Sequence, residues 1–427
     1  MNYLHLNLSK LKNKTNKICI IGAGYVGLPL GIRLAEQKFN VTIIDKNEKI
    51  INSLKKGKSH LSNIDAKNIF ENKKNLLFTS KYNVIKNCDF IIICLPTPLT
   101  KNKEPDLSYI NDCMKEMKKY LSKGKAIFLE STTYPGTTDE LAQKYLGDFI
   151  LGKNFFLIYS PEREDPANKK YNISNVPKVV SGHTKNCLKL AINFYNYITK
   201  ETVPVSSTKT AELTKLLENI YRSVNVGLVN EMKMIADKMN INIFEVIDAA
   251  STKPFGFSTF YPGPGLGGHC IPIDPFYLSW KAKEFDFSTK FIELAGEINS
   301  NMPMWISNKI LENLNLLGKS IKLSKILILG LTYKKNVNDL RESPSIKILE
   351  LLKKYKTKLY FNDPYFNKDF NKAKFFKMDY KKLKNFDCVV LLTDHDVYDY
   401  KKILSNSNLI FDTRGKFQKN KKIVISI

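Results

Sequence analysis

The feature that most restricts how this chain folds is a glycine-rich turn near its start. A short β-branched run from Lys17 to Gly22 leads into a G-x-G-x-x-G motif at residues 22–27, and a helical pattern of leucine and isoleucine follows. A second apolar run ends at Asp45, about 20 residues further along the chain. A strand, a tight turn, a helix and a second strand that ends in an acid form the first unit of a parallel, doubly wound α/β sheet.

Each of the three motif glycines has a physical reason to be glycine. Gly22 permits the tight turn, Gly24 lets a pyrophosphate approach the backbone, and Gly27 lets the helix pack closely on the strand. The Asp45 carboxylate can accept a hydrogen bond from a ribose 2′-hydroxyl and would repel a 2′-phosphate, which favours NAD over NADP. Two threonines join this set because they follow predicted strands, at the sheet edge where ligands bind. The predicted cofactor-binding residues are Gly22, Gly24, Tyr25, Val26, Gly27, Asp45, Thr97 and Thr132.

The hydrophobic period divides the rest of the chain. Strand patterns that alternate with helix-sized segments lie at 41–45, 89–95, 126–130 and 155–160. Residues 208–236 follow a helical period without an internal proline, and a second helical stretch follows at 243–250. Strand patterns return at 325–330, 358–361, 387–393 and 409–412. We expect two Rossmann-like doubly wound domains joined by a long helix: an NAD-binding domain at 1–205, a central helical domain at 206–300 and a second Rossmann-like domain at 301–427.

Charge and composition narrow the class of protein. The formal net charge is +26, but the lysines are spread along the chain and no nucleic-acid recognition motif occurs, so a basic nucleic-acid-binding protein is only the alternative. A positive field also helps to capture an anionic substrate. The seven cysteines form no C-x-x-C pair, which predicts neither a zinc site nor a disulfide framework and fits a reducing cytoplasm. We expect no signal peptide and no membrane span, and we expect residues 1–16 to form a frayed lead-in.

A second informative segment is the glycine- and proline-rich run before Cys270. Six of the eight residues from Pro262 to His269 are glycine or proline, so the backbone can turn tightly and approach a ligand. A thiolate is a good nucleophile toward an aldehyde, so an accessible Cys270 predicts an oxidation through a covalent sulfur intermediate. Asp274 follows four residues later, where it either assists proton transfer or serves as a turn carboxylate before Pro275.

Three further residues can support this chemistry. Lys215 and Asn219 are four positions apart on the predicted long helix, hence on one face, and both can stabilise an oxyanion. The alternative for Lys215 is a solvated face or a salt bridge with Glu212 or Glu218. Glu162 follows a predicted strand and can activate water, with a loop salt bridge as the alternative.

The second α/β segment carries cations just after its predicted strands. Lys334, Arg341 and Arg414 stand in such positions, where they suit phosphates or a uracil carbonyl. The alternative is solvated surface charge, which competes strongly in so basic a chain.

Together these segments resemble the UDP-glucose/GDP-mannose dehydrogenase family, whose members oxidise a sugar C6 alcohol to a carboxylate. The resemblance runs from Ile18 to the C-terminus. It rests on the turn at 22–27, Glu130-Ser131-Thr132, Ser160-Pro161-Glu162-Arg163, Ala211-Glu212 with Lys215 and Asn219, Gly267-Gly268-His269-Cys270 with Asp274, and Lys334 with Arg341-Glu342-Ser343-Pro344. The form of residues 267–277 is most similar to the branch that acts on UDP-N-acetylglucosamine or its galacto isomer and supplies bacterial surface polysaccharides. Branches acting on UDP-N-acetylmannosamine or UDP-glucose are the alternatives.

The resemblance implies a four-electron oxidation with NAD as the hydride acceptor. A cysteine would add to the aldehyde as a thiohemiacetal, a second hydride transfer would leave a thioester, and water would release the acid. In catalysis it implies Cys270 as nucleophile, Lys215 and Asn219 at the oxyanion, Asp274 in proton transfer, and Glu162 and Thr132 at the water. In substrate binding it implies Glu162, Lys215, Asn219, Tyr261, Gly267, Lys334, Arg341 and Arg414. It also implies a homodimer formed through the long central helix, with no nucleic acid or membrane partner.

Two departures from the family pattern stand out. The UDP-glucose branch has a lysine between the cysteine and the acid, where this chain has Ile273, so that cofactor contact is absent. A second family glutamate aligns ambiguously with Asp165 or Pro166, and its role is not transferred.

Overall fold

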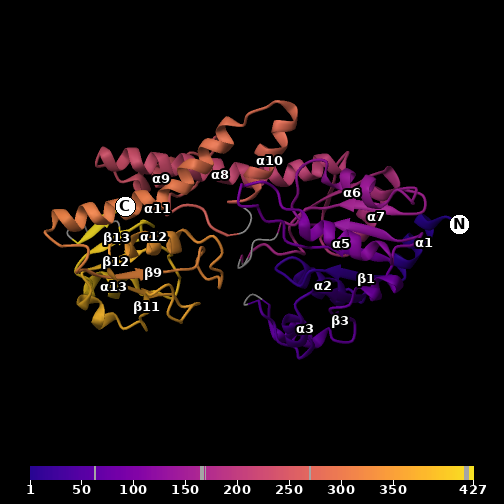
Figure 1. Cartoon of the computed structure of the whole chain (residues 1–427), viewed down its shortest axis with the longest axis horizontal. Helices are drawn as coiled ribbons and strands as arrows, with labels where there is room; N and C mark the ends of the chain where they lie inside the picture. Colours follow the sequence, from indigo (N-terminus) through magenta and orange to yellow (C-terminus); the bar gives the residue numbers. More distant parts are fainter. Residues whose placement is uncertain (62–63, 164–167, 169, 269–270, 418–422) are drawn as a thin grey trace. The chain divides into compact units, whose positions relative to one another are not determined.

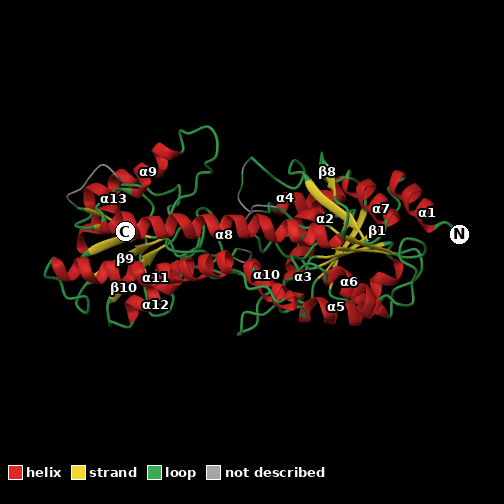
Figure 2. Cartoon of the chain, turned by 90° about the horizontal axis from the view of Figure 1, so that it is seen from above, coloured by secondary structure: helices red, strands yellow, loops and turns green. Residues whose placement is uncertain are grey.

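The structure is a computed structural model that describes residues 1–61, 64–163, 168, 170–268, 271–417 and 423–427. The chain forms two compact units. Unit 1 comprises Met1–Glu218 with Phe276–Phe287, and unit 2 comprises Asn219–Pro275 with Ser288–Ile427. The boundary between the units passes through helix α8 (Thr208–Lys238), which Figure 2 shows as one continuous helix.

Unit 1 is built on an eight-stranded sheet of the order β3-β2-β1-β4-β5-β6-β7-β8, within the described residues. The first six strands are parallel, whereas β7 runs antiparallel to β6 and parallel to β8. Figure 1 shows this sheet, with β1 and β3 labelled, in the indigo-to-magenta part of the chain. The strands span Lys17–Ile21 (β1), Asn40–Ile44 (β2), Leu76–Thr79 (β3), Phe90–Ile93 (β4), Ala126–Leu129 (β5), Phe156–Tyr159 (β6), Lys178–Gly182 (β7) and Thr202–Pro204 (β8). The helices span Tyr3–Lys12 (α1), Gly27–Glu36 (α2), Glu48–Lys55 (α3), Ala66–Glu71 (α4), Tyr82–Asn87 (η1), Ser108–Lys118 (α5), Thr137–Tyr145 (α6) and Lys185–Tyr195 (α7).

Both faces of this sheet are buried, which explains why its central strands read as unbroken apolar runs. Ile18 and Ile20 of β1 lie in a core cluster with residues of α2 and α7. Their neighbours Cys19 and Ile21 point to the opposite face and join a second cluster with residues of α5 and α6. The alternation follows from the period of two along a strand.

The structure corrects the expectation of a frayed N-terminus. Residues 3–12 form helix α1, whose Leu11 is buried in the core of unit 1. Asn7 Nδ2 donates a hydrogen bond to Gly124 O at 2.9 Å, and Lys10 Nζ lies 2.6 Å from Asp89 Oδ1. This polar segment is therefore an amphipathic helix and not a frayed end. The prediction was wrong because composition does not reveal the long-range contacts that hold the helix in place.

Three strands of unit 1 were not anticipated: β3, β7 and β8. They are short, and β7 begins with a lysine, so none of them shows the long apolar run of a central parallel strand. The antiparallel direction of β7 also departs from a simple repetition of parallel units.

The middle of the chain is helical. After α8 come α9 (Ile243–Ala250), α10 (Asp274–Ala282), η2 (Lys283–Phe285) and α11 (Lys290–Leu316). Within unit 2, Gly227 of α8 faces α11, where an added Cβ would lie 3.2 Å from Ala295 Cβ. In the described part of the chain, no helix combines the length and the apolar composition needed to cross a bilayer.

Unit 2 is built on a parallel sheet of the order β11-β10-β9-β12-β13-β14, again within the described residues. This order repeats that of the first six strands of unit 1 and is the Rossmann order. Ile326 and Ile328 face α11 and α12, whereas Leu327 and Leu329 face the opposite core. The elements span Lys325–Leu329 (β9), Pro344–Lys353 (α12), Lys358–Asn362 (β10), Lys374–Phe375 (β11), Tyr380–Asn385 (η3), Cys388–Leu391 (β12), Tyr400–Asn406 (α13), Ile410–Asp412 (β13) and Val424–Ser426 (β14).

Candidate active site

The glycine turn of unit 1 leaves an open backbone surface. Gly22 has a φ of +108°, and an added Cβ would lie 2.4 Å from Cys94 O. At Gly27 a Cβ would lie 2.0 Å from Gly22 O, so helix and strand are too close for any other residue. Gly24, by contrast, has no atom within 4 Å of the position of a Cβ. A pyrophosphate can therefore approach the backbone at Gly24, next to the start of α2, as a dinucleotide requires.

Asp45 directly follows β2 beside this turn and is half-buried. Its Oδ2 accepts from Ala23 N at 2.9 Å and its Oδ1 accepts from Asn47 N at 2.8 Å. Each carboxylate oxygen can accept a further hydrogen bond, so the geometry suits a ribose hydroxyl. The predicted residues Tyr25 and Val26 are half-buried and link the turn to α2.

Two other predicted cofactor residues meet at the ends of neighbouring strands. Thr97 lies beyond β4 and Thr132 beyond β5, and Thr97 Oγ1 donates to Thr132 O at 2.8 Å. Thr97 is buried and Thr132 is half-buried. The bond joins the two loops at the carboxyl edge of the sheet, the edge to which the Gly24 turn also belongs.

Glu162 lies in a buried ionic cluster at the same edge. Lys178 Nζ is 2.9 Å from Glu162 Oε2 and 3.0 Å from Glu130 Oε2. Glu130 Oε1 also accepts from Tyr195 OH at 2.7 Å. Burial acts to raise the pKa of Glu162, but Lys178 and the Arg163 N–H outweigh it and hold that pKa below its ordinary value. Glu162 is thus a carboxylate with a side chain only 12% exposed that stays ionised.

Glu212 and Glu218, the two glutamates near Lys215 in α8, have partners other than this lysine. Glu212 accepts from Gly136 N at 2.6 Å and from Thr138 N at 2.9 Å, and so caps the start of α6. Glu218 pairs with the guanidinium of Arg163. Among the described contacts neither glutamate binds Lys215, whose positive charge instead helps to lower the pKa of Glu162.

Unit 2 carries the other part of the predicted catalytic set. Asn219 Nδ2 donates to Asp274 Oδ2, and Asp274 is a buried residue that begins α10. This contact fixes which way the Asn219 amide faces. The predicted nucleophile Cys270 lies outside the described residues, as does His269. Just before them, a Cβ at Gly267 would lie 2.6 Å from Tyr333 Cβ, so only glycine fits there.

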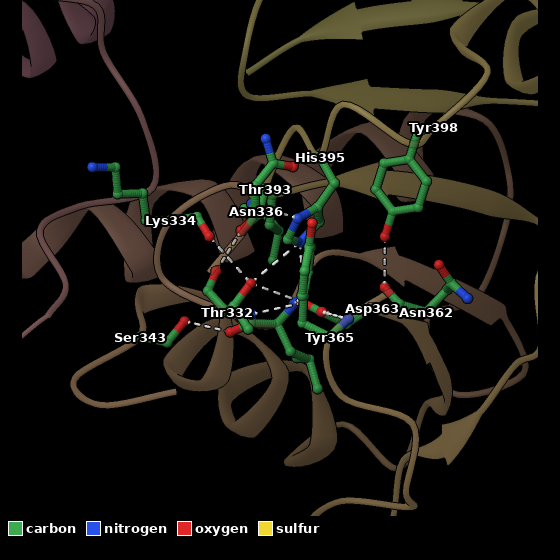
Figure 3. Close-up of polar contacts among 12 residues, drawn as sticks. Thr332, Lys334, Asn336, Ser343, Asn362, Asp363, Tyr365, Thr393, His395 and Tyr398 are labelled. Carbon is green, nitrogen blue, oxygen red and sulfur yellow. Dashed lines mark hydrogen bonds and ion pairs between the residues drawn. The ribbon is translucent and has the colours of Figure 1, made fainter. Parts of the chain in front are cut away.

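The loop that carries Lys334 is tied to a buried cluster in unit 2, drawn in Figure 3. Asp363 Oδ2 accepts from Leu331 N at 2.8 Å and from Thr332 N at 2.9 Å, and lies 3.2 Å from His395 Nε2. His395 Nδ1 accepts from Asn336 N at 3.0 Å, so the imidazole joins the far end of the same loop. Figure 3 shows the Lys334 side chain extending away from this cluster.

The remaining predicted substrate residues have partners of their own. Arg341 pairs with Asp339, with Nη2 2.7 Å from Oδ2. Arg414 Nε donates to Leu392 O at 2.7 Å, and its guanidinium packs on Gly263. Tyr261 OH donates to the Asp248 carboxylate at 2.7 Å.

Four residues of these clusters escaped the sequence analysis as functional candidates. Lys178 opens a β-branched run after a proline, which signals a strand but not a buried lysine. His395 stands between two aspartates and reads as a solvated loop. Glu130 and Asp363 each follow a strand, and that position was the available signal.

Comparison with known proteins places all these segments in one family pattern. Models of the NAD-binding, central and UDP-binding domains of the UDP-glucose/GDP-mannose dehydrogenase family match residues 16–199, 209–301 and 327–419. Protein CapL of Staphylococcus aureus is 37% identical over 416 residues, covering 93% of this chain and 95% of the relative. UDP-N-acetyl-D-glucosamine 6-dehydrogenase of Salmonella typhi is 33% identical over 388 residues, covering 90% of each chain.

A solved structure is similar over nearly the whole chain. UDP-D-ManNAc dehydrogenase of Pyrococcus horikoshii superposes with a TM-score of 0.84 at 28% identity, covering 93% of this chain and 94% of that one. A curated UDP-N-acetyl-D-mannosamine dehydrogenase, from Methanocaldococcus jannaschii, is 34% identical over 415 residues, with 93% and 92% coverage.

Proposed function

Because the chain belongs to the UDP-glucose/GDP-mannose dehydrogenase family, we propose that it oxidises the C6 alcohol of a UDP-N-acetylhexosamine to the carboxylate, with UDP-N-acetylglucosamine as the first candidate. The chain is an NAD-dependent UDP-sugar dehydrogenase. The observation that carries the finer proposal is that similar proteins are named for UDP-N-acetylglucosamine and for UDP-N-acetylmannosamine, which are both N-acetylhexosamines. The product is a building block for a surface polysaccharide.

The overall reaction consumes one water and transfers two hydrides. NAD, when bound, accepts hydride from the substrate carbon. The thiolate of Cys270 forms a bond to the aldehyde carbon, and loss of the second hydride turns that adduct into a thioester. Water then adds to the thioester carbon, the carbon–sulfur bond breaks, and the carboxylate leaves with the thiol restored.

The residues of unit 1 serve the cofactor and the hydrolytic water. Gly24 and the start of α2 hold the pyrophosphate, and Asp45 holds the adenosine ribose. Glu162, kept ionised by Lys178, accepts a proton from the attacking water, and Thr132 helps to orient that water.

Lys215 and Asn219 supply positive charge and an N–H to the oxyanion that forms during addition to the carbonyl. The bond from Asn219 to Asp274 orients the amide for this task and leaves its second N–H for the substrate. Asp274 assists proton transfer at the sulfur.

The nucleotide part of the substrate falls to unit 2. The UDP-binding model covers Lys334, Arg341 and Arg414, whose charges suit a pyrophosphate. Tyr261 and Gly267 complete the proposed substrate-binding set, and Gly267 packs against Tyr333, next to Lys334. This assignment divides the chain into an NAD-binding domain at 1–205, a central domain at 206–300 and a UDP-sugar domain at 301–427.

The central helix provides the surface for a homodimer. Apolar side chains recur along α8 at spacings of three, four and seven, and each is 41–62% exposed: Leu217, Tyr221, Leu228, Met232 and Ile235. Such a stripe on a soluble helix is typical of a helix-to-helix interface. Changing Leu228 and Met232 to lysine is expected to halve the mass measured by light scattering, and an unchanged mass would contradict this interface.

A panel of sugar nucleotides tests the reaction. Purified protein with NAD is expected to form two reduced nicotinamides per UDP-N-acetylglucosamine, followed by absorbance. Turnover with UDP-N-acetylmannosamine instead would establish the second candidate, which the mannosamine-named relatives favour. UDP-glucose is the third arm. Steady-state turnover should almost vanish in Cys270→Ser, and a variant with wild-type turnover would refute the covalent route.

A further inference from the structure

Lys178 is a nearly fully enclosed cation near the proposed water site. It is 4% exposed, and its Nζ lies near three oxygens: Glu162 Oε2 at 2.9 Å, Glu130 Oε2 at 3.0 Å and Pro161 O at 3.3 Å. An ammonium has three hydrogens, so each one has an acceptor. We call Glu130, Glu162, Lys178 and Tyr195 the Lys178 cluster.

Sheet topology explains how this lysine reaches the carboxyl edge of the sheet. Parallel strands β5 and β6 end at that edge, and Glu130 and Glu162 follow them. Strand β7 runs antiparallel to β6, with Tyr159 opposite Ser181, so β7 begins at the edge where β5 and β6 end. Its first residue, Lys178, therefore lies at the ligand-binding edge, whereas a parallel β7 would have placed it at the other edge.

Helix α7 contributes Tyr195 to the cluster. Tyr195 ends this helix and is fully buried, and its hydroxyl donates to Glu130 Oε1 at 2.7 Å. The same ring lies 5.2 Å from Lys178 Nζ, a distance at which it attracts the cation. Glu130 is thus held on both oxygens, and it holds Lys178 in turn.

The two glutamates of the cluster differ in the direction of their pKa shifts. Burial raises the pKa of Glu130 above its ordinary value, whereas the pKa of Glu162 is lowered. Two nearby carboxylates whose environments drive their pKa values apart are typical of an acid–base site. Among the described residues, the ionisable side chains that interact with Glu162 include Glu130, Lys178, Lys215 and Cys94, and the Arg163 backbone N–H donates to its carboxylate.

We propose that Lys178 is a positioning residue that keeps Glu162 ionised and aimed at the water that hydrolyses the thioester, with Glu130 and Tyr195 holding the lysine in place. This inference rests on the proposed function. In the step it supports, the water oxygen bonds to the thioester carbon and one water proton passes to Glu162. The carbon–sulfur bond then breaks, the proton on Glu162 is transferred to the departing sulfur, and the acid product releases the second water proton to solvent as it becomes the carboxylate. Lys178 itself touches neither substrate nor cofactor.

The first test replaces Lys178 with methionine, which fills the same volume without the charge. Steady-state kcat is expected to fall about 100-fold, as for loss of an oriented general base. Both hydride transfers precede hydrolysis, so a rapid burst of two reduced nicotinamides per site should survive. Intact-protein mass spectrometry should then show the acyl adduct on Cys270. The acid limb of the pH profile should move to higher pH, and Lys178→Arg should recover most of kcat.

A second variant separates positioning from folding, because an isolated Lys178→Met leaves two buried carboxylates without a counter-charge. The double variant Lys178→Met with Glu130→Gln removes that repulsion and should regain thermal stability. If Lys178 acts on Glu162, this double variant stays slow and still accumulates the adduct. Full recovery of kcat in it would show a purely structural role and overturn the inference.

The controls distinguish this inference from the proposed function. If wild-type protein forms no reduced nicotinamide with any sugar nucleotide, the proposed function fails. If wild-type protein turns over but Lys178→Met keeps its rate, its pH profile and an unmodified Cys270, only the role of Lys178 fails.

Discussion

The first six strands of the unit 1 sheet have the same order as the six strands of the unit 2 sheet. The two sheets differ in the surroundings of the aspartate that follows the second strand. In each, the first strand ends in a glycine with positive φ, Gly22 at +108° and Gly330 at +87°. In each, the second strand is followed by an aspartate that accepts from the backbone of that turn: Asp45 from Ala23 N, and Asp363 from Leu331 N. Asp45 is half-buried, whereas the Asp363 side chain is fully enclosed.

The turn residues explain the difference. Unit 1 has Gly24 two residues after its first glycine, with open space around it. Unit 2 has Thr332 at that place, fully buried, with its hydroxyl 3.0 Å from Asp363 Oδ2. His395 covers the same carboxylate from the loop after β12. The acid of unit 1 is therefore left partly open, at the position where we propose that NAD binds, whereas the acid of unit 2 holds the loop that carries Lys334. Shared topology does not decide the ligand.

The largest expected contrast lies in the two acids themselves. Asp363→Ala leaves the buried N–H groups of Leu331 and Thr332 without their acceptor, and should lower the stability of unit 2 by about 3–5 kcal/mol. Asp45→Ala should cost about 1 kcal/mol, since its site is open to water. In a Trp280→Phe background the remaining tryptophan, Trp305, reports the urea unfolding of unit 2. In a Trp305→Phe background the remaining tryptophan, Trp280, reports the unfolding of unit 1. Equal losses would break the comparison.

Acid and base should affect the two units in opposite directions. Burial raises the pKa of Glu212 in unit 1 to about 7, from 4.5, so its contribution is complete below pH 4.5 and is lost as the pH rises to about 7. The loss should reach roughly 3 kcal/mol. Burial acts to raise the pKa of Asp363, but His395 and backbone N–H groups hold it below 3.8, so unit 2 loses stability as the pH falls through that region.

The change in unfolding free energy with pH is compared between the wild type and Glu212→Gln for unit 1, and between the wild type and Asp363→Asn for unit 2. The tryptophan of each unit reports its unfolding. A wild-type unit 1 whose stability, relative to Glu212→Gln, does not change between pH 4.5 and 7 would contradict the first half of this prediction.

A smaller effect is expected from Gly24→Ala. The added methyl meets no protein atom, so the melting temperature should stay unchanged, but it occupies the surface where the pyrophosphate approaches. NAD affinity measured by calorimetry should fall about tenfold, or about 1.4 kcal/mol. The matched control is Gly22→Ala, which should lower stability because its methyl would meet Cys94 O. Unchanged NAD affinity in Gly24→Ala would separate this turn from the cofactor.

The smallest effect concerns the charge on Asp45. Asp45→Asn keeps the shape but weakens the hydrogen bond to the ribose, so NAD should bind about fivefold less tightly. NADP should gain relative to NAD because the repulsion of its 2′-phosphate is removed. Calorimetric titration with both dinucleotides measures the ratio, and a ratio that stays constant would show that Asp45 does not select the cofactor.

Local sequence patterns correctly predicted the strands that are apolar on both faces and the helix whose apolar residues keep a regular period. The central strands β1, β4, β5 and β9 are apolar on both faces, and α8 has an uninterrupted helical period, so their types follow from residue spacing alone. Strands β3, β7 and β8 and helix α1 were missed. Their stability depends on partners far along the chain, such as Asp89 for α1, and no local window contains that information.

The sequence by itself determined the two doubly wound sheets, the long helix and the dinucleotide turn, because glycine spacing and hydrophobic period act over a few residues. Only the tertiary structure decided that Glu162 is paired with a lysine from an antiparallel strand, that Glu212 caps another helix, and that Asp363 is enclosed by His395. These outcomes depend on which distant groups share a low-dielectric space with each carboxylate, and that proximity is set by how strands and helices pack.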